Sequence, residues 1–348
     1  MVDVNASATS SNANFNRRVD KWIRRHKTKL WWLHSLYALI LGIGIMWLGK
    51  RNFAYLRVAV FHISFIWLSS LLLPKLLKLR RVPAQSAPHL RLIVNFFNKN
   101  LYQQMLFFVL PIYYTSATVG SRNLVFVLLV GFSAVLSTLD VIYDRHLSAS
   151  RYLNAGFFAF NLFALVNVML PILWSVSNTL TTRVSGILAF LGFLTLGYPA
   201  LQSFIRRTGL ALGVGVLFFA LVELGRPFIP PAPLRMASVE FGTEFDRESL
   251  QMLAPMTELK ADGASQLYGL TAIRAPLGLQ EKLRHRWFEN GELVFASAFY
   301  NVVGGRTEGF RLWTRCTFGR VTPYTNIRLD LETEGGQLVG RATLHAGR

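Results

Sequence analysis

Two short segments near the C-terminus each carry an indole ring two residues after an imidazole or guanidinium group. His285 precedes Trp287 in this way, and Arg311 precedes Trp313. Residues two apart in a strand share one face of a sheet, so each pair presents its side chains together. Aromatic faces stack on flat ligands, and arginine binds anions through paired hydrogen bonds. The pattern therefore predicts a binding surface for a sugar or an anionic polymer.

A structural role for the same four residues stays open. Trp287 and Trp313 would then belong to the core of a sheet, and a backbone group would satisfy His285. The two hypotheses differ in what they expect of solvent exposure, because a binding surface needs exposed side chains.

A second group of polar residues interrupts long apolar stretches. It consists of His62, Asp140, Asn161 and Asn167. Ionisable side chains inside a membrane are costly and often mark a transport path, whereas asparagines more often join helices through hydrogen bonds. Asp140 lies near the end of its stretch, which favours an interfacial role. This group leaves open a transporter or lipid-handling protein with a path among the second, fourth and fifth stretches.

Signatures of enzymes are missing from the sequence. It has no Gly-Lys-Ser/Thr phosphate loop, no Gly-x-Ser-x-Gly, no His-Glu-x-x-His and no Cys/His metal spacing. The single cysteine, Cys316, rules out an internal disulfide and is expected to be a small buried residue. We therefore predict no catalytic residue, no metal and no cofactor. An envelope enzyme that uses His285 or carboxylates of the C-terminal part remains the third hypothesis.

Long apolar stretches fill the first two thirds of the chain. A helix needs about 20 mostly apolar residues to cross a bilayer core about 30 Å thick. Strands of a membrane barrel would alternate and would be about half as long. We therefore predict about seven transmembrane helices: Trp31–Leu48, Phe53–Leu73, Leu101–Val119, Leu124–Tyr143, Ala155–Val176, Val184–Tyr198 and Leu210–Leu224.

Basic residues lie almost entirely on one side of these stretches. The chain from Pro227 onwards has 14 Lys/Arg and 13 Asp/Glu, so 23 of the 37 basic but only 5 of the 18 acidic residues precede it. The basic residues cluster before the first stretch and after the second, fourth and sixth. Basic loops stay cytoplasmic, which places the N-terminus inside and the C-terminal part outside. We expect the excess charge to attract anionic lipids at the cytoplasmic face, not nucleic acid.

Composition also divides the chain into domains. Four prolines follow the last apolar stretch, and beyond them the hydrophobic pattern alternates with a period of two. Turn signals such as Asn290-Gly291 separate the alternating segments. We predict a disordered basic cytoplasmic tail (1–28), a seven-helix transmembrane domain (29–226), a proline-rich connector (227–235) and an antiparallel, all-β, sandwich-like soluble domain (236–348).

The C-terminal part, roughly from Gly269 to Leu344, resembles the family of unknown function numbered 2914. The residues that carry the resemblance are His285, Trp287, Gly291, Gly304, Gly305, Arg311, Trp313 and Gly340. A Pro-Gly-x-Trp turn common in that family is absent, since the chain reads Arg-Val-Thr-Pro-Tyr at 320–324. The membrane half is similar to the multi-span segment fused to this domain in Gram-negative bacteria.

The resemblance implies an inner-membrane protein with a periplasmic sandwich, and it implies no known activity. The leading hypothesis is a non-enzymatic protein of the bacterial inner membrane. Its periplasmic sandwich would bind an envelope polymer, a peptide or a periplasmic partner protein.

Overall fold

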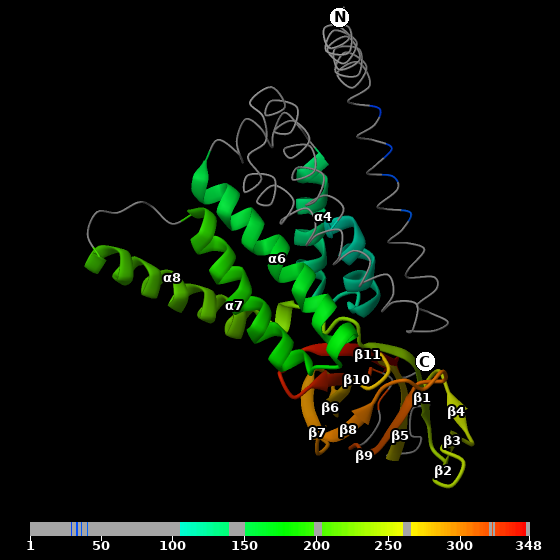
Figure 1. Cartoon of the computed structure of the whole chain (residues 1–348). Coiled ribbons are helices and arrows are strands. Elements are labelled where there is room, and N and C mark those ends of the chain that lie inside the picture. The colour runs from blue at the N-terminus through cyan, green and yellow to red at the C-terminus, as the bar shows by residue number, and fades with distance from the viewer. Residues whose placement is uncertain are drawn as a thin grey trace, which may run out of the picture.

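A helical region leads into a C-terminal β-sandwich in the computed structural model of the chain (Figure 1). The structure describes residues 105–138, 150–197, 204–259, 266–319, 322 and 324–345, together with positions 29, 33, 36 and 40. The predicted tail (1–28), the second predicted span, His62 and Asp140 lie outside the described residues, as does the first predicted span apart from positions 33, 36 and 40.

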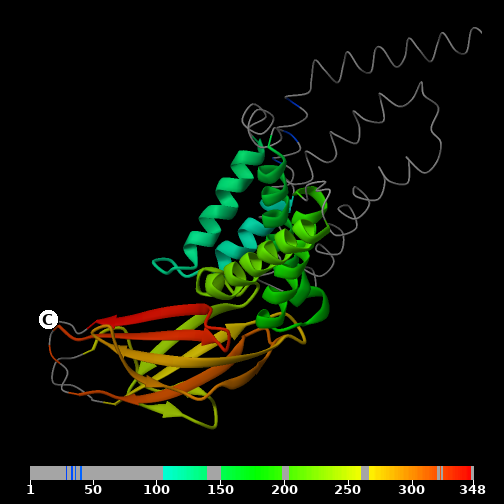
Figure 2. The same ribbon diagram turned by 90° about the vertical axis from the view of Figure 1, so that its left-hand side faces the viewer.

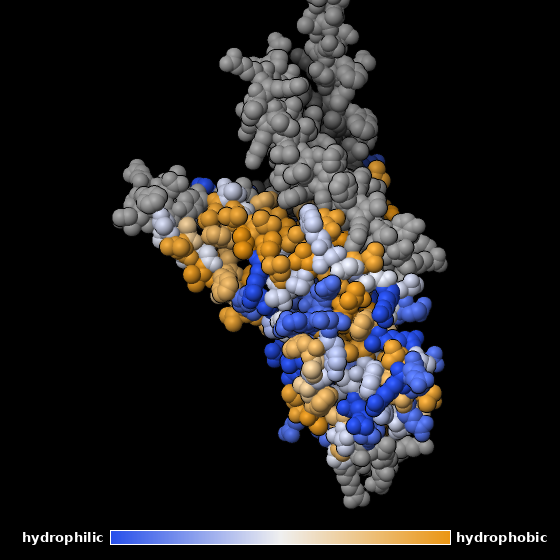
Figure 3. All heavy atoms as spheres, turned by 60° about the horizontal axis from the view of Figure 1, so that its bottom comes forward, coloured by the Kyte–Doolittle hydropathy of each residue, from blue (hydrophilic) through white to orange (hydrophobic). Residues whose placement is uncertain are grey.

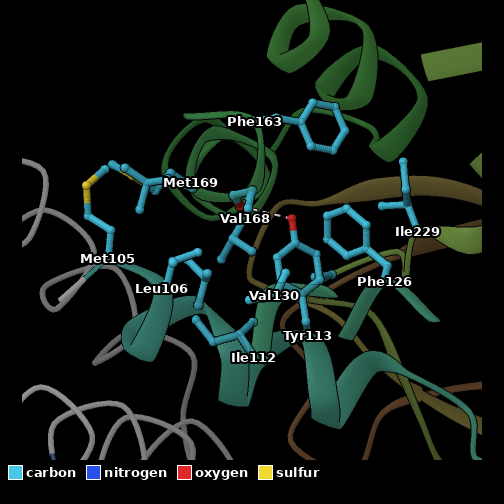
Figure 4. Close-up of a cluster of buried hydrophobic side chains, with 14 of the residues drawn as sticks. Met105, Leu106, Ile112, Tyr113, Phe126, Val130, Phe163, Val168, Met169 and Ile229 are labelled. Carbon is cyan, nitrogen blue, oxygen red and sulfur yellow. Dashed lines mark hydrogen bonds between the residues drawn. The ribbon is translucent and has the colours of Figure 1, made fainter. Parts of the chain in front are cut away.

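The helical region packs around a mixed aromatic and aliphatic core. Tyr113 meets Phe126 edge to face with ring centroids 4.9 Å apart, and Phe126 in turn contacts Phe163 at 6.1 Å (Figure 4). Such edge-to-face pairs stabilise a core beyond the area that they bury. The helices that surround this core are Met105–Ser116, α4 (Leu124–Thr138), α6 (Arg151–Trp174), α7 (Asn178–Gly197) and α8 (Phe204–Gly225).

The prediction of about seven transmembrane helices is wrong. Among the described residues, two helices are long and apolar enough to cross a membrane, Arg151–Trp174 and Thr208–Phe228. The apolar helices Met105–Ser116 and Leu124–Ser137 are shorter, and at 1.5 Å per residue they reach only about 18–21 Å. The sixth predicted span is a helix, α7, but its first two turns are rich in Asn, Thr, Arg and Ser.

The C-terminal part is an antiparallel β-sandwich, as the alternating pattern predicts. One sheet has the strand order β4-β1-β5-β9 and the other the order β11-β10-β6-β7, with β8 also paired to β6. A small hairpin of β2 and β3 lies outside both. The strands are β1 (Arg235–Gly242), β2 (Phe245–Asp246), β3 (Gln251–Met252), β4 (Pro255–Met256), β5 (Gln266–Arg274), β6 (Gln280–Glu289), β7 (Glu292–Ala296), β8 (Tyr300–Val303), β9 (Phe310–Thr317), β10 (Asn326–Thr333) and β11 (Leu338–His345).

Trp287 fills the centre of the sandwich. Its ring packs edge to face against Phe241 at 5.8 Å and against Phe318 at 5.7 Å. Gly269 on β5 makes room for it, because a Cβ there would lie 2.6 Å from Cζ2 of Trp287. The β6–β7 turn has positive φ at both Asn290 (49°) and Gly291 (91°), the conformation that the Asn-Gly pair predicts.

The proline-rich segment joins two cores instead of running through solvent. It starts with a short 3-10 helix, η2 (Arg226–Phe228). Ile229 and Ala232 are buried in the helical core, and Leu234 is buried in the sandwich core. The sandwich therefore lies directly against the ends of the helices, as the view in Figure 2 shows.

Candidate functional site

His285 and Trp287 lie in the core of the sandwich and not on its surface. Both side chains are on the inner face of β6 and have 0% exposure. Arg311 and Trp313 lie on the opposite face of β9, since Leu312 and Thr314 are the buried residues of that strand. The surface shared by all four side chains, which the sequence predicts, is therefore not formed, because the alternation of β9 turns one pair away from the core.

His285 lies in the middle of a chain of hydrogen bonds that connects the two sheets. Its Nδ1 lies 2.8 Å from the hydroxyl of Thr314, and its Nε2 lies 2.9 Å from the hydroxyl of Thr271. The indole N–H of Trp287 donates to Thr314 at 2.8 Å, and Thr271 donates to the carbonyl of Leu312 at 3.3 Å.

These contacts fix the positions of the protons. A hydroxyl has one hydrogen to donate. Because Thr271 donates its one hydrogen to the carbonyl of Leu312, it accepts from Nε2 of His285. In a neutral imidazole Nδ1 is then an acceptor, so Thr314, which also accepts from Trp287, donates to it. His285 is thus neutral and protonated on Nε2. Burial lowers its pKa from 6.5 to about 3, so its chemistry here is structural at neutral pH.

Arg311 and Trp313 belong to an aromatic and arginine cluster on the outer face of the β1–β5–β9 sheet. Trp313 is half-buried, with its ring centroid 4.9 Å from that of Phe245 and 6.2 Å from that of Tyr268. The guanidinium of Arg247 lies 5.3 Å from the centroid of the Trp313 ring. The two sequence-predicted residues that reach the surface are therefore side by side with three that the sequence analysis did not single out.

The β2–β3 hairpin lies over part of this cluster. Phe245 and Arg247 come from that hairpin, and Arg311 donates a hydrogen bond to the carbonyl of Leu250 at 2.9 Å. Leu250 has a positive φ of 55°, so the turn is held in an uncommon conformation. Aromatic faces with arginines beside them suit a flat or anionic ligand, and we define Arg247, Tyr268, Arg311 and Trp313 as the aromatic face.

The opposite outer face of the sandwich is rich in arginines that are already paired. Glu332 forms ion pairs with Arg284 and with Arg286, the second at 3.1 Å. Asp330 accepts both Nε and Nη2 of Arg341, at 2.6 and 2.8 Å. These pairs connect neighbouring strands, and each carboxylate is shared by two guanidinium groups.

Of the intramembrane candidates, the structure describes Asn161 and Asn167, both buried in α6. Asn167 donates to the hydroxyl of Tyr113 at 3.1 Å and accepts from Thr182 of α7 at 3.2 Å. Asn161 donates to the carbonyl of Phe157 in its own helix at 2.6 Å. Asn167 therefore joins three helices, which is the helix-joining role that the sequence analysis favours for asparagine.

A buried carboxylate that no sequence pattern predicts lies at the junction of the two regions. Glu281 of β6 is 5% exposed and accepts the backbone N–H of Asn178 at 2.6 Å and its Nδ2 at 3.2 Å. Asn178 is the first residue of α7, so a strand of the sandwich caps a helix of the other region. Burial raises the pKa of Glu281, and the bonds from Asn178 partly oppose that shift. Only the alternation of β6 places Glu281 inward; no local motif marks it.

Two further features of the described part of the chain concern metal ligands and the single thiol. No group of three or more His, Cys, Asp or Glu residues there could hold a metal ion. Cys316 is buried, and burial raises the pKa of its thiol to about 11, so it is a thiol at neutral pH.

Comparisons with known proteins give a family without a function. The profile described as "Family of unknown function (DUF5924)" matches residues 12–271. No curated protein matches the chain. A crystal structure of an immunoglobulin-like protein from Pseudomonas aeruginosa is similar to it, with 14% identity and a TM-score of 0.22, over 33% of this chain and 97% of that one.

The family match differs from the resemblance that the sequence suggests. It names another family of unknown function, and it ends at residue 271, where the segment similar to the family numbered 2914 begins. The expectation of an uncharacterised family is confirmed, and the resemblance to family 2914 stays a prediction.

Proposed function

The chain belongs to DUF5924, a family of unknown function, and we propose that it is a membrane-embedded protein that holds a β-sandwich binding module against the surface of the bilayer. The proposal has two parts, which are the location of the helices and the role of the sandwich. Each part has its own supporting observation and its own test.

One observation carries the membrane location: α8 is apolar on all sides and is almost unburied. Only 6% of the most apolar stretch of Thr208–Phe228 is buried within the protein. Leu212, Val216 and Phe219 are each about two-thirds exposed. A helix that is hydrophobic all round either lies in a protein core or faces lipid. Since the described protein leaves α8 uncovered, lipid is the surrounding that suits it.

The surface as a whole supports the same assignment. Figure 3 shows apolar side chains over the helices and hydrophilic side chains where the sandwich begins. In water, each exposed leucine or phenylalanine of α8 would forgo about 1.5–3 kcal/mol of burial free energy. An exposed apolar patch of this kind is typical of a membrane or partner contact.

The direction of the helices supports a sandwich outside the cytoplasm. The C-terminal end of α6 and the start of α7 contact the sandwich, through Ser175 to Leu277 and Asn178 to Glu281. The basic pair Arg206-Arg207 lies at the other end of α8, away from the sandwich. With basic ends in the cytoplasm, the sandwich faces the periplasm of a Gram-negative inner membrane and the N-terminus stays inside.

The aromatic face supports a binding role that needs no catalysis. Arg311 and Trp313 lie there with Tyr268 and Arg247, and aromatic and arginine side chains are frequent anchors of recognition. An envelope polymer or a periplasmic protein suits such a face. The transporter alternative has less support, because Asn167 bonds to two neighbouring helices.

Cell fractionation tests the location. The full chain is expected in the membrane fraction and is expected to resist an alkaline carbonate wash, whereas a peripheral protein is released. Replacing Leu212, Val216 and Phe219 by Ser should impair insertion. The same number of serines at exposed apolar positions of the sandwich (Leu253, Leu277 and Leu293) is the matched control. Release of the unmodified chain by carbonate would refute membrane embedding.

Reporter fusions test the orientation. An enzyme that is active only outside the cytoplasm should be active after Arg348 and silent at Ser86. For the binding role, the full chain in detergent is incubated with envelope polymers and with periplasmic extract. Arg311→Ala together with Trp313→Ala should abolish retention while lowering the melting temperature far less than Trp287→Ala does, and Arg315→Ala, on the same strand face, should leave retention intact.

A further inference from the structure

Two arginines share one carboxylate where the apolar surface of the helices ends. Arg183 of α7 donates through Nε to Oε1 of Glu223 at 2.9 Å, and Arg226 of η2 donates through Nη2 to the same oxygen at 2.8 Å. We call Arg183, Glu223 and Arg226 the arginine clamp. It connects α7 and α8 at their sandwich ends.

The clamp has more donors than acceptors. Two guanidinium groups carry two charges and ten N–H bonds, against one carboxylate. Arg226 is 8% exposed, and its Nε is buried without a hydrogen-bond partner among the described residues. The side chain of Arg183 is 54% exposed. The clamp therefore has a net positive charge and one group that solvent or a ligand can reach.

Lipid would surround the clamp if the helices are embedded as proposed. Arg183 projects between Leu180 and Ile187 on α7, which are 52% and 59% exposed, and Leu224 on α8 is 77% exposed. A cationic side chain among lipid-facing residues turns toward the polar headgroups. Its flexible stem lets the guanidinium reach that level.

The height of the clamp matches the headgroup level. From Thr208 to Arg226 the chain rises about 27 Å as a helix, close to the roughly 30 Å of a bilayer core. Arg206 and Arg207 precede this stretch, and Arg226 ends it. The polar junction with the sandwich follows at once, since a Cβ on Gly335 would lie 3.8 Å from Nη1 of Arg226.

Other charged groups near the junction are already used. Lys282 and Glu334 form an ion pair at 3.2 Å, and Glu281 caps α7. The charges of Lys282 and Glu334 cancel each other. Glu281 is therefore the one group of these three whose negative charge could offset the positive charge of the clamp. A phosphate could therefore accept from the exposed guanidinium of Arg183 without displacing Glu223, while the buried Arg226 holds the shared carboxylate and adds its positive charge to the site.

We propose that the arginine clamp binds the phosphate of an anionic phospholipid headgroup in the leaflet next to the sandwich. The proposal rests on the membrane location proposed above and adds a specific site to it. This leaflet is the one opposite the basic N-terminal tail, so the site is distinct from the general attraction of that tail for anionic lipid. Guanidinium groups suit the task because they bind phosphate through paired, charge-assisted hydrogen bonds.

Native mass spectrometry of the full chain in detergent measures the affinity for single lipids. The probes are phosphatidylglycerol, phosphatidylcholine and inorganic phosphate. We expect phosphatidylglycerol to bind at least about tenfold more tightly than phosphatidylcholine, because choline brings its own cation to the phosphate. Inorganic phosphate should compete weakly, since it lacks acyl chains to contact α7 and α8. Equal competition by inorganic phosphate would refute a lipid site.

Substitutions separate a site from general charge. Arg183→Gln should weaken phosphatidylglycerol binding about tenfold, and its exposure means that the fold should tolerate it. Arg122→Gln is the matched control, because Arg122 is an exposed arginine in the loop before α4, whose neighbour Asn123 bonds to β11. We expect Arg122→Gln to change affinity less than about twofold. Equal losses in both variants would show surface attraction only.

Glu223→Gln should change the affinity for phosphatidylglycerol in the opposite direction to Arg183→Gln. Removing the competing carboxylate should tighten phosphatidylglycerol binding severalfold, whereas a purely structural clamp would lose stability and gain no affinity. The melting temperature of each variant is measured in parallel, so that unfolding is not mistaken for lost binding. Release by carbonate would refute the membrane location itself; retention without lipid preference would refute only this site.

Discussion

The helical region and the sandwich both bury polar side chains, but they differ in the apolar surface that they leave exposed. Around α6 and α7 the buried residues include Asn161, Asn167, Thr181 and Thr182, while α8 exposes leucines, valines and phenylalanines. The sandwich buries Trp287 with a ring of leucines, and its charged side chains lie mostly outside.

The difference follows from the surroundings proposed for each region. In water, burying apolar surface stabilises a fold by about 25 cal/mol per Å². Between helices in lipid that gain is small, so close packing and hydrogen bonds hold the helices together. Losing a buried side chain should therefore change the stability of the two regions by different amounts. Five substitutions or conditions test this.

Trp287→Ala should have the largest effect. It empties the centre of the sandwich and removes the donor to Thr314, so we expect a loss of about 3–5 kcal/mol. Hydrogen exchange of β5 and β6 in the full chain measures it. Trp313→Ala, at a half-buried site, should cost distinctly less. Equal losses of stability would mean that Trp313 on the aromatic face contributes as much to the packing of the sandwich as Trp287 in its interior.

His285→Leu should destabilise the sandwich by about 2–4 kcal/mol. The substitution leaves the hydroxyls of Thr271 and Thr314 buried without their imidazole partner. Urea titration of the full chain in detergent gives the free energy. His345→Leu, at an exposed position near the C-terminus, is the control and should be nearly neutral. A neutral His285→Leu would mean that the network adds nothing to stability.

The stability of the sandwich should also fall in acid because of His285. Its pKa is lowered to about 3 in the folded state, against 6.5 when unfolded, so only the unfolded chain takes up the proton between these values. Stability should decrease as the pH falls from 6.5 toward 3, by about 1.4 kcal/mol per pH unit from this group. His285→Leu should remove that part of the slope; an unchanged slope would contradict a neutral buried imidazole.

Asn167→Leu should cost less than His285→Leu, about 1 kcal/mol or below. Both partners keep another acceptor, since Tyr113 still donates to the carbonyl of Ala164 and Thr182 to that of Asn178. Thermal unfolding of the helices in detergent measures the change, with Asn161→Leu alongside. A loss of stability as large as that of His285→Leu would mean that the two regions depend equally on their buried polar side chains.

Glu281→Gln should have the smallest effect, within about 1 kcal/mol at neutral pH. The amide oxygen of glutamine still accepts from the N–H of Asn178, and the buried charge disappears. Because the pKa of Glu281 is raised in the folded state, its contribution is complete in acid and is lost as the pH rises. This sign is opposite to that of His285. A large loss in Glu281→Gln would show that the carboxylate charge stabilises the start of α7.

Sequence patterns predicted the sandwich well and the number of spans badly. Period-two alternation and the Asn290-Gly291 turn depend on residues close in sequence, and both are present in the structure. Apolar content alone cannot separate a spanning helix from a shorter packed one, such as Met105–Ser116.

The exposure of the four candidate site residues was predicted in part. Trp313 and Arg311 reach the surface, as a binding role needs, whereas His285 and Trp287 with the same spacing are buried. Alternation shows which residues share a face, but it does not show which face the second sheet covers. That choice depends on how the two sheets pack, and it is made by contacts between residues far apart in the chain.

By itself, the sequence determined the helical and β-rich halves, the turn at Asn290 and the absence of an internal disulfide, because each depends on local pattern or composition. Only the tertiary structure decided that Glu281 caps α7, that His285 is neutral between two threonines, and that Arg183 and Arg226 share Glu223. Each of these contacts joins residues at least 14 positions apart in the chain, except the ion pair between Glu223 and Arg226, which are three positions apart. Hydrogen bonds and ion pairs act over about 3 Å, so their partners are set by packing and not by spacing in the chain.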